Sequence, residues 1–204
     1  SSSFVLFNNL HIAKENLSLV LTFLKDEKLI DYFVSKGVDI NEEDNDGNGI
    51  FNYTAKKGNQ MMMNLLIQKG VNYKNLNNIN GNAMIFASYG TRSSSNKLST
   101  YKYLDSIGIE ANVTTLKGVN PLHSIVYKVK DTNIINYFMH KGVNINQVNI
   151  KGFNVLMNSC YTNDTNVISH LIKTTKNINH KNNKGETALT LSLIHISEPT
   201  RHSI

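Results

Sequence analysis

The stretch Asn133-Ile-Ile-Asn-Tyr-Phe-Met-His-Lys-Gly142-Val-Asn-Ile-Asn146 nearly repeats an earlier one, Lys28-Leu-Ile-Asp-Tyr-Phe-Val-Ser-Lys-Gly37-Val-Asp-Ile-Asn41. In the earlier copy, four apolar residues fall on one side of an α-helix: Leu29, Ile30, Phe33 and Val34. The lysine and glycine that follow predict the end of the helix, because a cation suits the last turn and glycine accepts a positive φ. Each copy therefore predicts an amphipathic helix followed by a short extended segment.

Two glycine landmarks recur along the chain with the same period. The first ends each predicted helix at Gly37, Gly70, Gly108 and Gly142, with Thr175 in the corresponding place of a fifth copy. The second follows 10 or 11 residues later, at Gly47, Gly81, Gly118, Gly152 and Gly185. A shared period of about 33 to 38 residues predicts an array of repeated structural units that stack on one another.

A shorter helix is predicted ahead of each long one. It is clearest at Asn120-Pro-Leu-His123, where Pro121 suits the first helical position and Asn120 can cap the helix. This opening resembles the Thr-Pro-Leu-His motif of the ankyrin-repeat family, and Thr54-Ala-Lys-Lys-Gly-Asn59 resembles the turn between that family's helices. The resemblance implies an all-α fold, an ankyrin-repeat solenoid of stacked helix-turn-helix units with short hairpin-like loops. It also implies that His123 bridges neighbouring units by hydrogen bonds.

The repeat register sets the predicted domain boundaries. We expect an ankyrin-repeat domain at residues 13–190, with residues 1–12 ending a preceding repeat. The units, numbered 1 to 6 below, are expected at 13–45, 46–79, 80–116, 117–150, 151–183 and, truncated, 184–190. Unit 1 places its short helix at 16–24. Residues 91–96 of unit 3 are extra, and a tolerated loop insertion is the favoured interpretation.

The last residues interrupt the repeat. The segment from Leu191 to Arg201 reads as the translation, in one frame, of a transposase-type sequencing adapter. We therefore expect residues 191–204 to be a non-native tail without function. Because the chain also begins with Ser1 rather than Met, we expect it to be an internal fragment of a longer protein.

Composition excludes several classes of protein. The sequence has no run of 18 apolar residues, so no membrane-spanning helix is predicted. The single cysteine excludes an internal disulfide framework and weakly favours a reducing compartment. The 21 Lys and Arg residues exceed the 15 Asp and Glu residues. They are scattered rather than gathered in one stripe, so a nucleic-acid interface is not favoured. The main local cluster is acidic and is expected in a solvated turn: Glu42, Glu43, Asp44 and Asp46.

No catalytic, cofactor-binding or metal-binding motif occurs in the sequence. Phosphate loops, dinucleotide-binding glycine motifs, His-Glu-x-x-His and Gly-x-Ser-x-Gly are all absent. Cys160 falls in a small-residue position of a short helix and is expected to be packed rather than reactive. Met62 and Met63 are expected in the core, so no soft-metal site is predicted. We predict no catalytic residue, no cofactor and no small-molecule substrate.

The resemblance implies that the concave face binds a partner protein. We predict partner-binding residues on the loop tips and after the short helices: Asn45, Asp46, Asn48, Lys56 and Lys57 at unit 2; Leu116, Lys117, Val119, Tyr127 and Lys128 at unit 4; Ile150, Lys151, Phe153, Tyr161 and Thr162 at unit 5. The aromatic residues are the favoured anchors. Two alternatives remain open. One is a targeting module of a larger enzyme or effector. The other, less favoured, is a nucleic-acid contact through five lysines: Lys56, Lys57, Lys117, Lys128 and Lys151.

Overall fold

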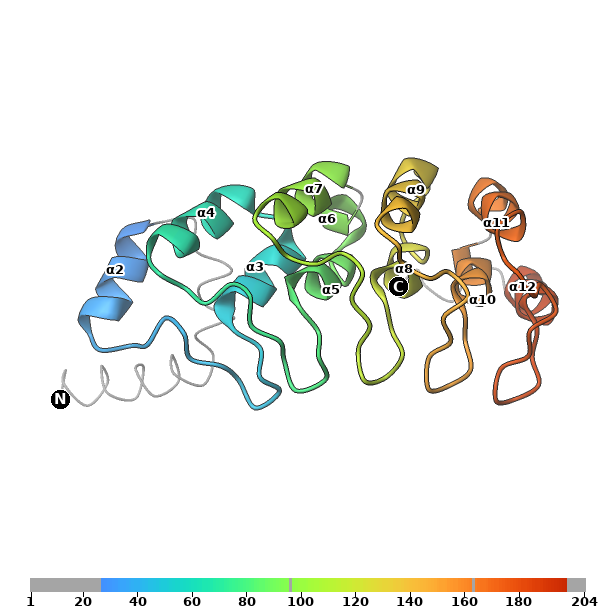
Figure 1. The fold of residues 1–204 in the computed structure, drawn as a ribbon, viewed down its shortest axis with the longest axis horizontal. Coiled ribbons are helices and arrows are strands. Elements are labelled where there is room, and N and C mark those ends of the chain that lie inside the picture. Colours follow the sequence, from blue (N-terminus) through green and yellow to red (C-terminus); the bar gives the residue numbers. More distant parts are fainter. Residues whose placement is uncertain (1–26, 96, 163, 198–204) are drawn as a thin grey trace.

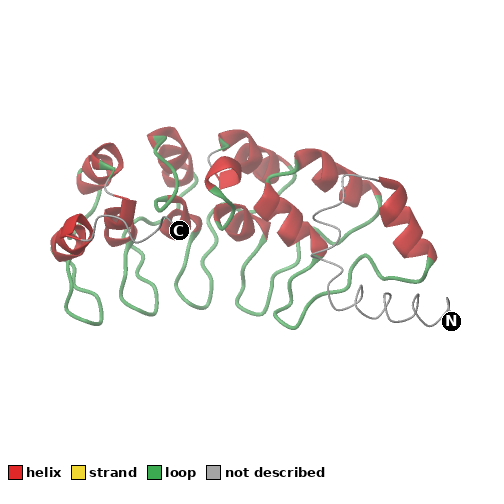
Figure 2. Ribbon diagram, turned by 180° about the vertical axis from the view of Figure 1, so that it is seen from behind, coloured by secondary structure: helices red, strands yellow, loops and turns green. Residues whose placement is uncertain are grey.

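The computed structural model describes residues 27–95, 97–162 and 164–197, and these residues form a row of helical pairs (Figure 1). The long helices make one layer: α2 (Glu27–Ser35), α4 (Gln60–Gln68), α7 (Leu98–Ser106), α9 (Thr132–His140) and α11 (Thr165–Ile172). The short helices make the other: α3 (Ile50–Lys57), α5 (Ala83–Ser88), α8 (Pro121–Ile125), α10 (Val155–Ser159) and α12 (Ala188–Ser197). The described residues contain no strand, and Figure 2 shows the loops projecting to one side.

Packing between the described helices follows the order of the chain. The short helices contact one another in sequence, α3 with α5, α5 with α8, α8 with α10 and α10 with α12. Each unit also packs its own pair, as α8 does with α9 and α10 with α11. Such neighbour-only packing is the defining property of a solenoid. The predicted fold class is confirmed.

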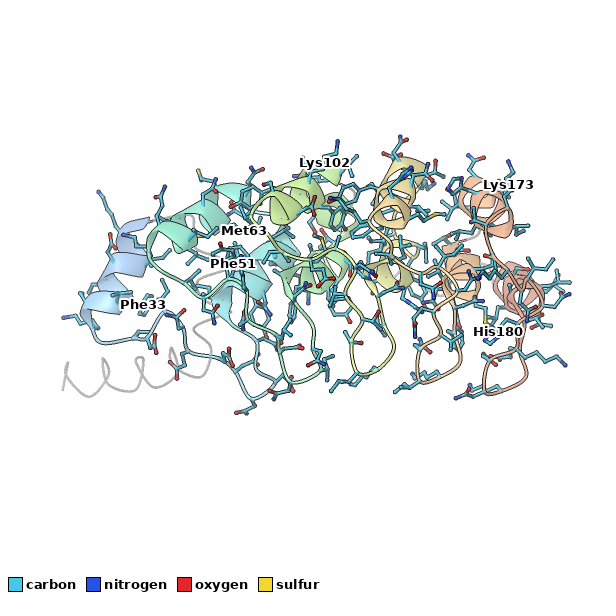
Figure 3. The ribbon with its side chains drawn as sticks, in the orientation of Figure 1. Phe33, Phe51, Met63, Lys102, Lys173 and His180 are labelled. Carbon is cyan, nitrogen blue, oxygen red and sulfur yellow. The ribbon has the colours of Figure 1, made fainter. Side chains whose placement is uncertain are left out.

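The core lies between the two helix layers. Met63 of α4 and Phe51 of α3 are fully buried there (Figure 3), and Ile134 and Ile135 occupy the same layer in unit 4. The burial of Met62 and Met63 agrees with the prediction. The predicted apolar face of α2 was too wide, because Val34 is 46% exposed. The residue of unit 3 at the repeat position equivalent to Val34 is the charged Asp105, so this edge of the long helix does not need an apolar side chain.

Asparagine and aspartate side chains cap the N-termini of several helices. The Asn120 side chain accepts from the backbone N–H of His123, with Pro121 at the first helical position, as predicted. Asn82 and Asn154 cap α5 and α10 in the same way, and Asp131 caps α9. Each such cap stabilises a helix by about 1 kcal/mol. Capping matters here because helices of five to nine residues are too short to be stable alone.

The hairpin loops each turn at a residue with a left-handed backbone. These residues are Gly47, Asn80, Gly118, Gly152 and Gly185. Gly81, the glycine landmark of this hairpin, is not in the set, and Asn80, one residue earlier, takes its place. Asn80 has a φ of 59°, which asparagine tolerates better than most side chains. With Asn80 as a turn residue, every turn lies 10 residues after the corresponding residue of the first landmark set, which is Gly37, Gly70, Gly108, Gly142 and Thr175.

Backbone hydrogen bonds tie neighbouring hairpins together. Leu116 N donates to Ile79 O at 2.9 Å, and Ile150 N donates to Lys117 O at 3.0 Å. Asn183 N donates to Lys151 O at 3.2 Å in the same register. The loop tips therefore form one continuous, ordered edge along the stack.

The insertion of unit 3 folds against the preceding unit. Residues 92–95 form a short helix, α6 (Arg92–Ser95), and the buried Ser94 donates its Oγ hydrogen to Lys56 O at 3.2 Å. The predicted short helix at 16–24 and residues 1–12 lie outside the described residues. Helix α12 runs through residues 191–197, and Leu191 is buried. The unit boundaries and the non-native origin of the tail stay predictions.

Candidate functional site

A cavity of about 450 Å³ opens between the hairpins and short helices of units 4 and 5. Six of the predicted partner-binding residues line it: Lys117, Val119, Tyr127, Lys151, Phe153 and Tyr161. Three come from each unit, so neither unit could form the cavity alone. Its volume falls within the range of about 300–1,000 Å³ that is usual for ligand sites.

Three aromatic rings form one wall of the cavity. The ring centroids of Tyr127 and Tyr161 are 5.5 Å apart, and those of Phe153 and Tyr161 are 6.4 Å apart. The two tyrosines are 37% and 38% exposed, although they touch each other. Burial raises the pKa of Tyr127 to about 12, so its hydroxyl is a neutral donor at physiological pH. The wall offers apolar ring surface together with hydroxyl groups.

The lining also contains the predicted candidate Ile150 and two residues that were not predicted, Asn149 and Asn158. Asn158 is only 3% exposed, and its Nδ2 donates to His123 O at 2.9 Å. Its Oδ1 is buried and has no hydrogen-bond partner among the described residues. An unsatisfied buried acceptor is unfavourable. The signal that could have identified it is an asparagine inside a helix that otherwise buries apolar side chains.

His123 connects unit 4 to unit 5 beneath the cavity. Its Nδ1 accepts from Asn120 N at 3.2 Å, which places the proton on Nε2. The Nε2 group then donates to Phe153 O in the next unit, 3.2 Å away. This is the bridge that the resemblance implied for His123.

Comparison with known families agrees with this architecture. Residues 122–199 match the family described as ankyrin repeats, three copies. Over this part of its length the chain is similar to ankyrin-repeat proteins. No curated protein matches the chain. The family match runs on through residues 191–199, part of the segment for which a non-native origin is predicted.

Ankyrin repeats generally mediate protein–protein interactions and are typically non-catalytic modules. Among residues 27–95, 97–162 and 164–197, no group of three His, Cys, Asp or Glu side chains could hold a metal ion. None of the described helices is long and apolar enough to cross a membrane. Cys160 is 2% exposed, and burial raises the pKa of its thiol to about 11. The thiol is therefore protonated and packed, as expected for a structural cysteine.

The predicted residues of unit 2 lie away from this cavity. Asn45, Asp46, Lys56 and Lys57 are exposed. Asn48 is only 6% exposed, so the prediction that it faces a partner was wrong. Its Nδ2 donates to Asp44 Oδ2 and its Oδ1 accepts from Asn77 Nδ2, both at 2.9 Å. Asn48 therefore joins the hairpin that turns at Gly47 to the one that turns at Asn80.

Two other predicted residues are engaged within the chain. The half-buried Lys128 donates from Nζ to Gly90 O at 2.7 Å and to Ser88 O at 3.2 Å, at the end of α5. Burial, together with the charge of Lys56, lowers its pKa. The hydroxyl of Thr162 donates to Ser159 O at 2.8 Å. Both residues stabilise helix ends of the ankyrin repeats, and neither lines the cavity.

Tyr89 of unit 3 was not among the predicted residues, and it does not line the cavity. Counted from Asn80, it occupies the position of Tyr127 and Tyr161 in their units. It is half-buried, and burial raises the pKa of its hydroxyl. Repeating the register in unit 3 with the correct turn residue would have identified it.

The His123 bridge predicts a pH dependence of stability. Burial holds the pKa of His123 below its usual value of 6.5, although the Phe153 carbonyl favours the charged form. The unfolded chain then binds the proton more tightly, so stability is full above pH 6.5 and falls as the pH drops below it. We expect a loss of about 1 kcal/mol between about pH 7.5 and about pH 5.5, measured by urea unfolding.

The control replaces His123 with methionine, which unit 5 carries at the same position as Met157. His123→Met should remove this part of the pH dependence, whereas His140→Gln, at an exposed site, should keep it. An unchanged pH profile in His123→Met would show that the imidazole does not titrate across this range.

Proposed function

We propose that the protein is a protein–protein interaction scaffold that holds a partner protein on its concave face. The centre of the contact is the cavity between units 4 and 5. The observation that carries the proposal is the contact between Tyr127 and Tyr161, which remain more than one-third exposed beside an open cavity. Stacking of the repeats does not need aromatic side chains there, since unit 2 has Lys56 in that position.

The mechanism is rigid display of a preformed surface. The hairpin that turns at Gly152 is bonded to the one that turns at Gly118 through Ile150 N and Lys117 O, and the His123 bridge joins unit 4 to unit 5. A surface that is already ordered loses little conformational entropy on binding. Tyrosine is also one of the residues most enriched among binding hot spots.

The proposal is tested by the variant Tyr127→Ala/Tyr161→Ala. Its free energy of unfolding should change by less than about 1 kcal/mol, since surface positions contribute little. Partner affinity should fall by a factor of about 30 or more, equivalent to about 2 kcal/mol at a hot spot. The partner is first captured with a photo-reactive phenylalanine derivative at position 161, in extract of the source organism, and its affinity is then measured by calorimetry.

The matched control is Tyr32→Ala on α2, where the side chain is 44% exposed on the long-helix layer. This variant should bind the captured partner as the original chain does. The proposal fails if Tyr127→Ala/Tyr161→Ala keeps full affinity. It also fails if that variant loses several kcal/mol of stability, which would place the two tyrosines in the core.

A further inference from the structure

We propose that the cavity between units 4 and 5 binds an extended acidic segment of the partner, with one large apolar side chain inserted among the aromatic rings. This inference rests on the proposed function and specifies the chemistry of the partner. The aspartate or glutamate neighbours of the inserted residue would meet Lys117 and Lys151.

The loop tips supply the first argument. In the hairpins that turn at Asn80 and Gly185, the residue two before the turn is an asparagine that bonds the neighbouring hairpin. Asn78 Nδ2 donates to Asn45 O at 3.0 Å, and Asn183 Nδ2 donates to Ile150 O at 2.9 Å. The hairpins that turn at Gly118 and Gly152 carry Leu116 and Ile150 at this position.

These two tip residues are 66% and 63% exposed. The two hairpins beside the cavity therefore lack the amide bond and present large apolar side chains to solvent. Ile150 itself lines the cavity, next to Phe153 and Tyr161. A grouped set of exposed apolar side chains marks an interaction site better than any single one does. This set fits an apolar anchor from a partner.

Charge supplies the second argument. Lys117 and Lys151 are the charged residues of the cavity lining, which contains no carboxylate. Among the described residues neither lysine forms an ion pair. Lys184 occupies the same position on the next hairpin, and backbone bonds connect the three tips in order. The corresponding residue of unit 2 is Asp46, so positive charge gathers at the cavity end of the stack.

The nearby acidic group does not cancel this charge. Glu186 lies close enough to Tyr161 to contribute to the raised pKa of that hydroxyl, behind the larger effect of burial. Its carboxylate accepts from Asn182 Nδ2 at 2.7 Å and is held within its own hairpin. A row of lysines beside an apolar cavity complements a segment that combines carboxylates with one apolar residue.

The arrangement of the aromatic rings favours a peptide over a nucleic acid. Binding of a nucleic-acid strand uses bases stacked on open aromatic faces. Here the rings of Tyr127 and Tyr161 contact each other at 5.5 Å with a tilt of 47°, so a base cannot enter between them.

The test uses fluorescein-labelled peptide pools with the chain as given. The first pool has a central Leu or Phe flanked by Asp and Glu. There are three matched pools. The second pool has a central Gly with the same acidic flanks. The third and fourth have a central Leu or Phe, flanked by Ser and Gly in the third and by Lys and Arg in the fourth. Oligo(dT) is the nucleic-acid probe. Fluorescence anisotropy at low salt should show the first pool binding at least about tenfold more tightly than every other probe.

Variants then separate charge from the apolar anchor. Lys117→Glu/Lys151→Glu should weaken binding of the first pool by a factor of about 30, and Tyr161→Ala should remove the preference for Leu or Phe over Gly. The matched control is Lys102→Glu/Lys173→Glu. Figure 3 shows these two lysines on the long-helix layer, away from the hairpins. The control should bind normally, and circular dichroism should show that every variant is folded.

Several outcomes would overturn the inference. One is that neutral or basic pools bind as tightly as the acidic pool. Another is that oligo(dT) binds more tightly and depends on the same two lysines, which would identify a nucleic-acid site. A third is that a partner crosslinks at position 161 of Lys117→Glu/Lys151→Glu as efficiently as it does in the original chain. That result would show that the partner segment is not acidic, while the scaffold function stands. If the acidic pool binds but no protein crosslinks at position 161, the scaffold function fails instead.

Discussion

Phe138→Ala should lower the free energy of unfolding by about 3–5 kcal/mol, the usual cost of truncating a fully buried phenylalanine. Phe138 of α9 has no exposed surface, and neither has Tyr101 of α7. Their ring centroids are 5.0 Å apart in an edge-to-face arrangement. This ring pair joins unit 3 to unit 4, so the substitution weakens an interface between units as well as the core of one unit.

A weakened interface has a consequence beyond lost stability. In a solenoid the units are coupled only through their neighbours, and unfolding of the whole is cooperative only while each interface is strong. We therefore expect urea unfolding of Phe138→Ala, followed by circular dichroism, to separate into two transitions. The control Tyr127→Ala removes an exposed aromatic ring from the same unit and should leave one transition near its original midpoint. A single transition shifted by less than about 1 kcal/mol in Phe138→Ala would contradict the argument.

The architecture was predictable because each unit repeats the same physical signals. An apolar pair such as Ile134 and Ile135 recurs in most of the long helices, and in the copies that end in glycine that glycine has a positive φ. In unit 3 the glycine landmark Gly81 is not the residue with the left-handed backbone. Asn80 takes that conformation instead. Requiring both sets of landmarks to keep the same spacing would have selected Asn80 over Gly81.

The candidate site was predictable only in part. Tyr127 and Tyr161 share a repeat position, so the sequence alone places them on the same surface, and the structure brings them together beside a cavity. The pattern predicts that Asn48 and Lys128 are exposed, yet Asn48 bonds Asn77 of the next hairpin and Lys128 bonds Gly90 of the preceding unit. The repeat period does not predict such contacts, because they depend on which residue the neighbouring hairpin or unit carries.

Gly118→Ala should lower the free energy of unfolding by about 3 kcal/mol, through two separate effects. The φ of Gly118 is +72°, and a left-handed backbone costs a residue with a side chain about 1–2 kcal/mol. The added Cβ would also lie 2.5 Å from Val148 O and 2.9 Å from the Cα of Asn149, both in the next hairpin. Backbone atoms cannot move aside as a flexible side chain can, so the hairpins of units 4 and 5 must separate.

Gly185→Ala is the control that isolates the second effect. Gly185 has a φ of +78°, nearly the same backbone strain, but no atom lies within 4 Å of its added Cβ. It should lose only about 1 kcal/mol. Hydrogen exchange of the Ile150 amide, which donates to Lys117 O, should accelerate in Gly118→Ala and stay slow in Gly185→Ala. Equal losses of stability in the two variants would mean that the hairpins adjust to the clash without cost. The cavity walls would then be free to shift, and binding to a preformed surface would lose its structural basis.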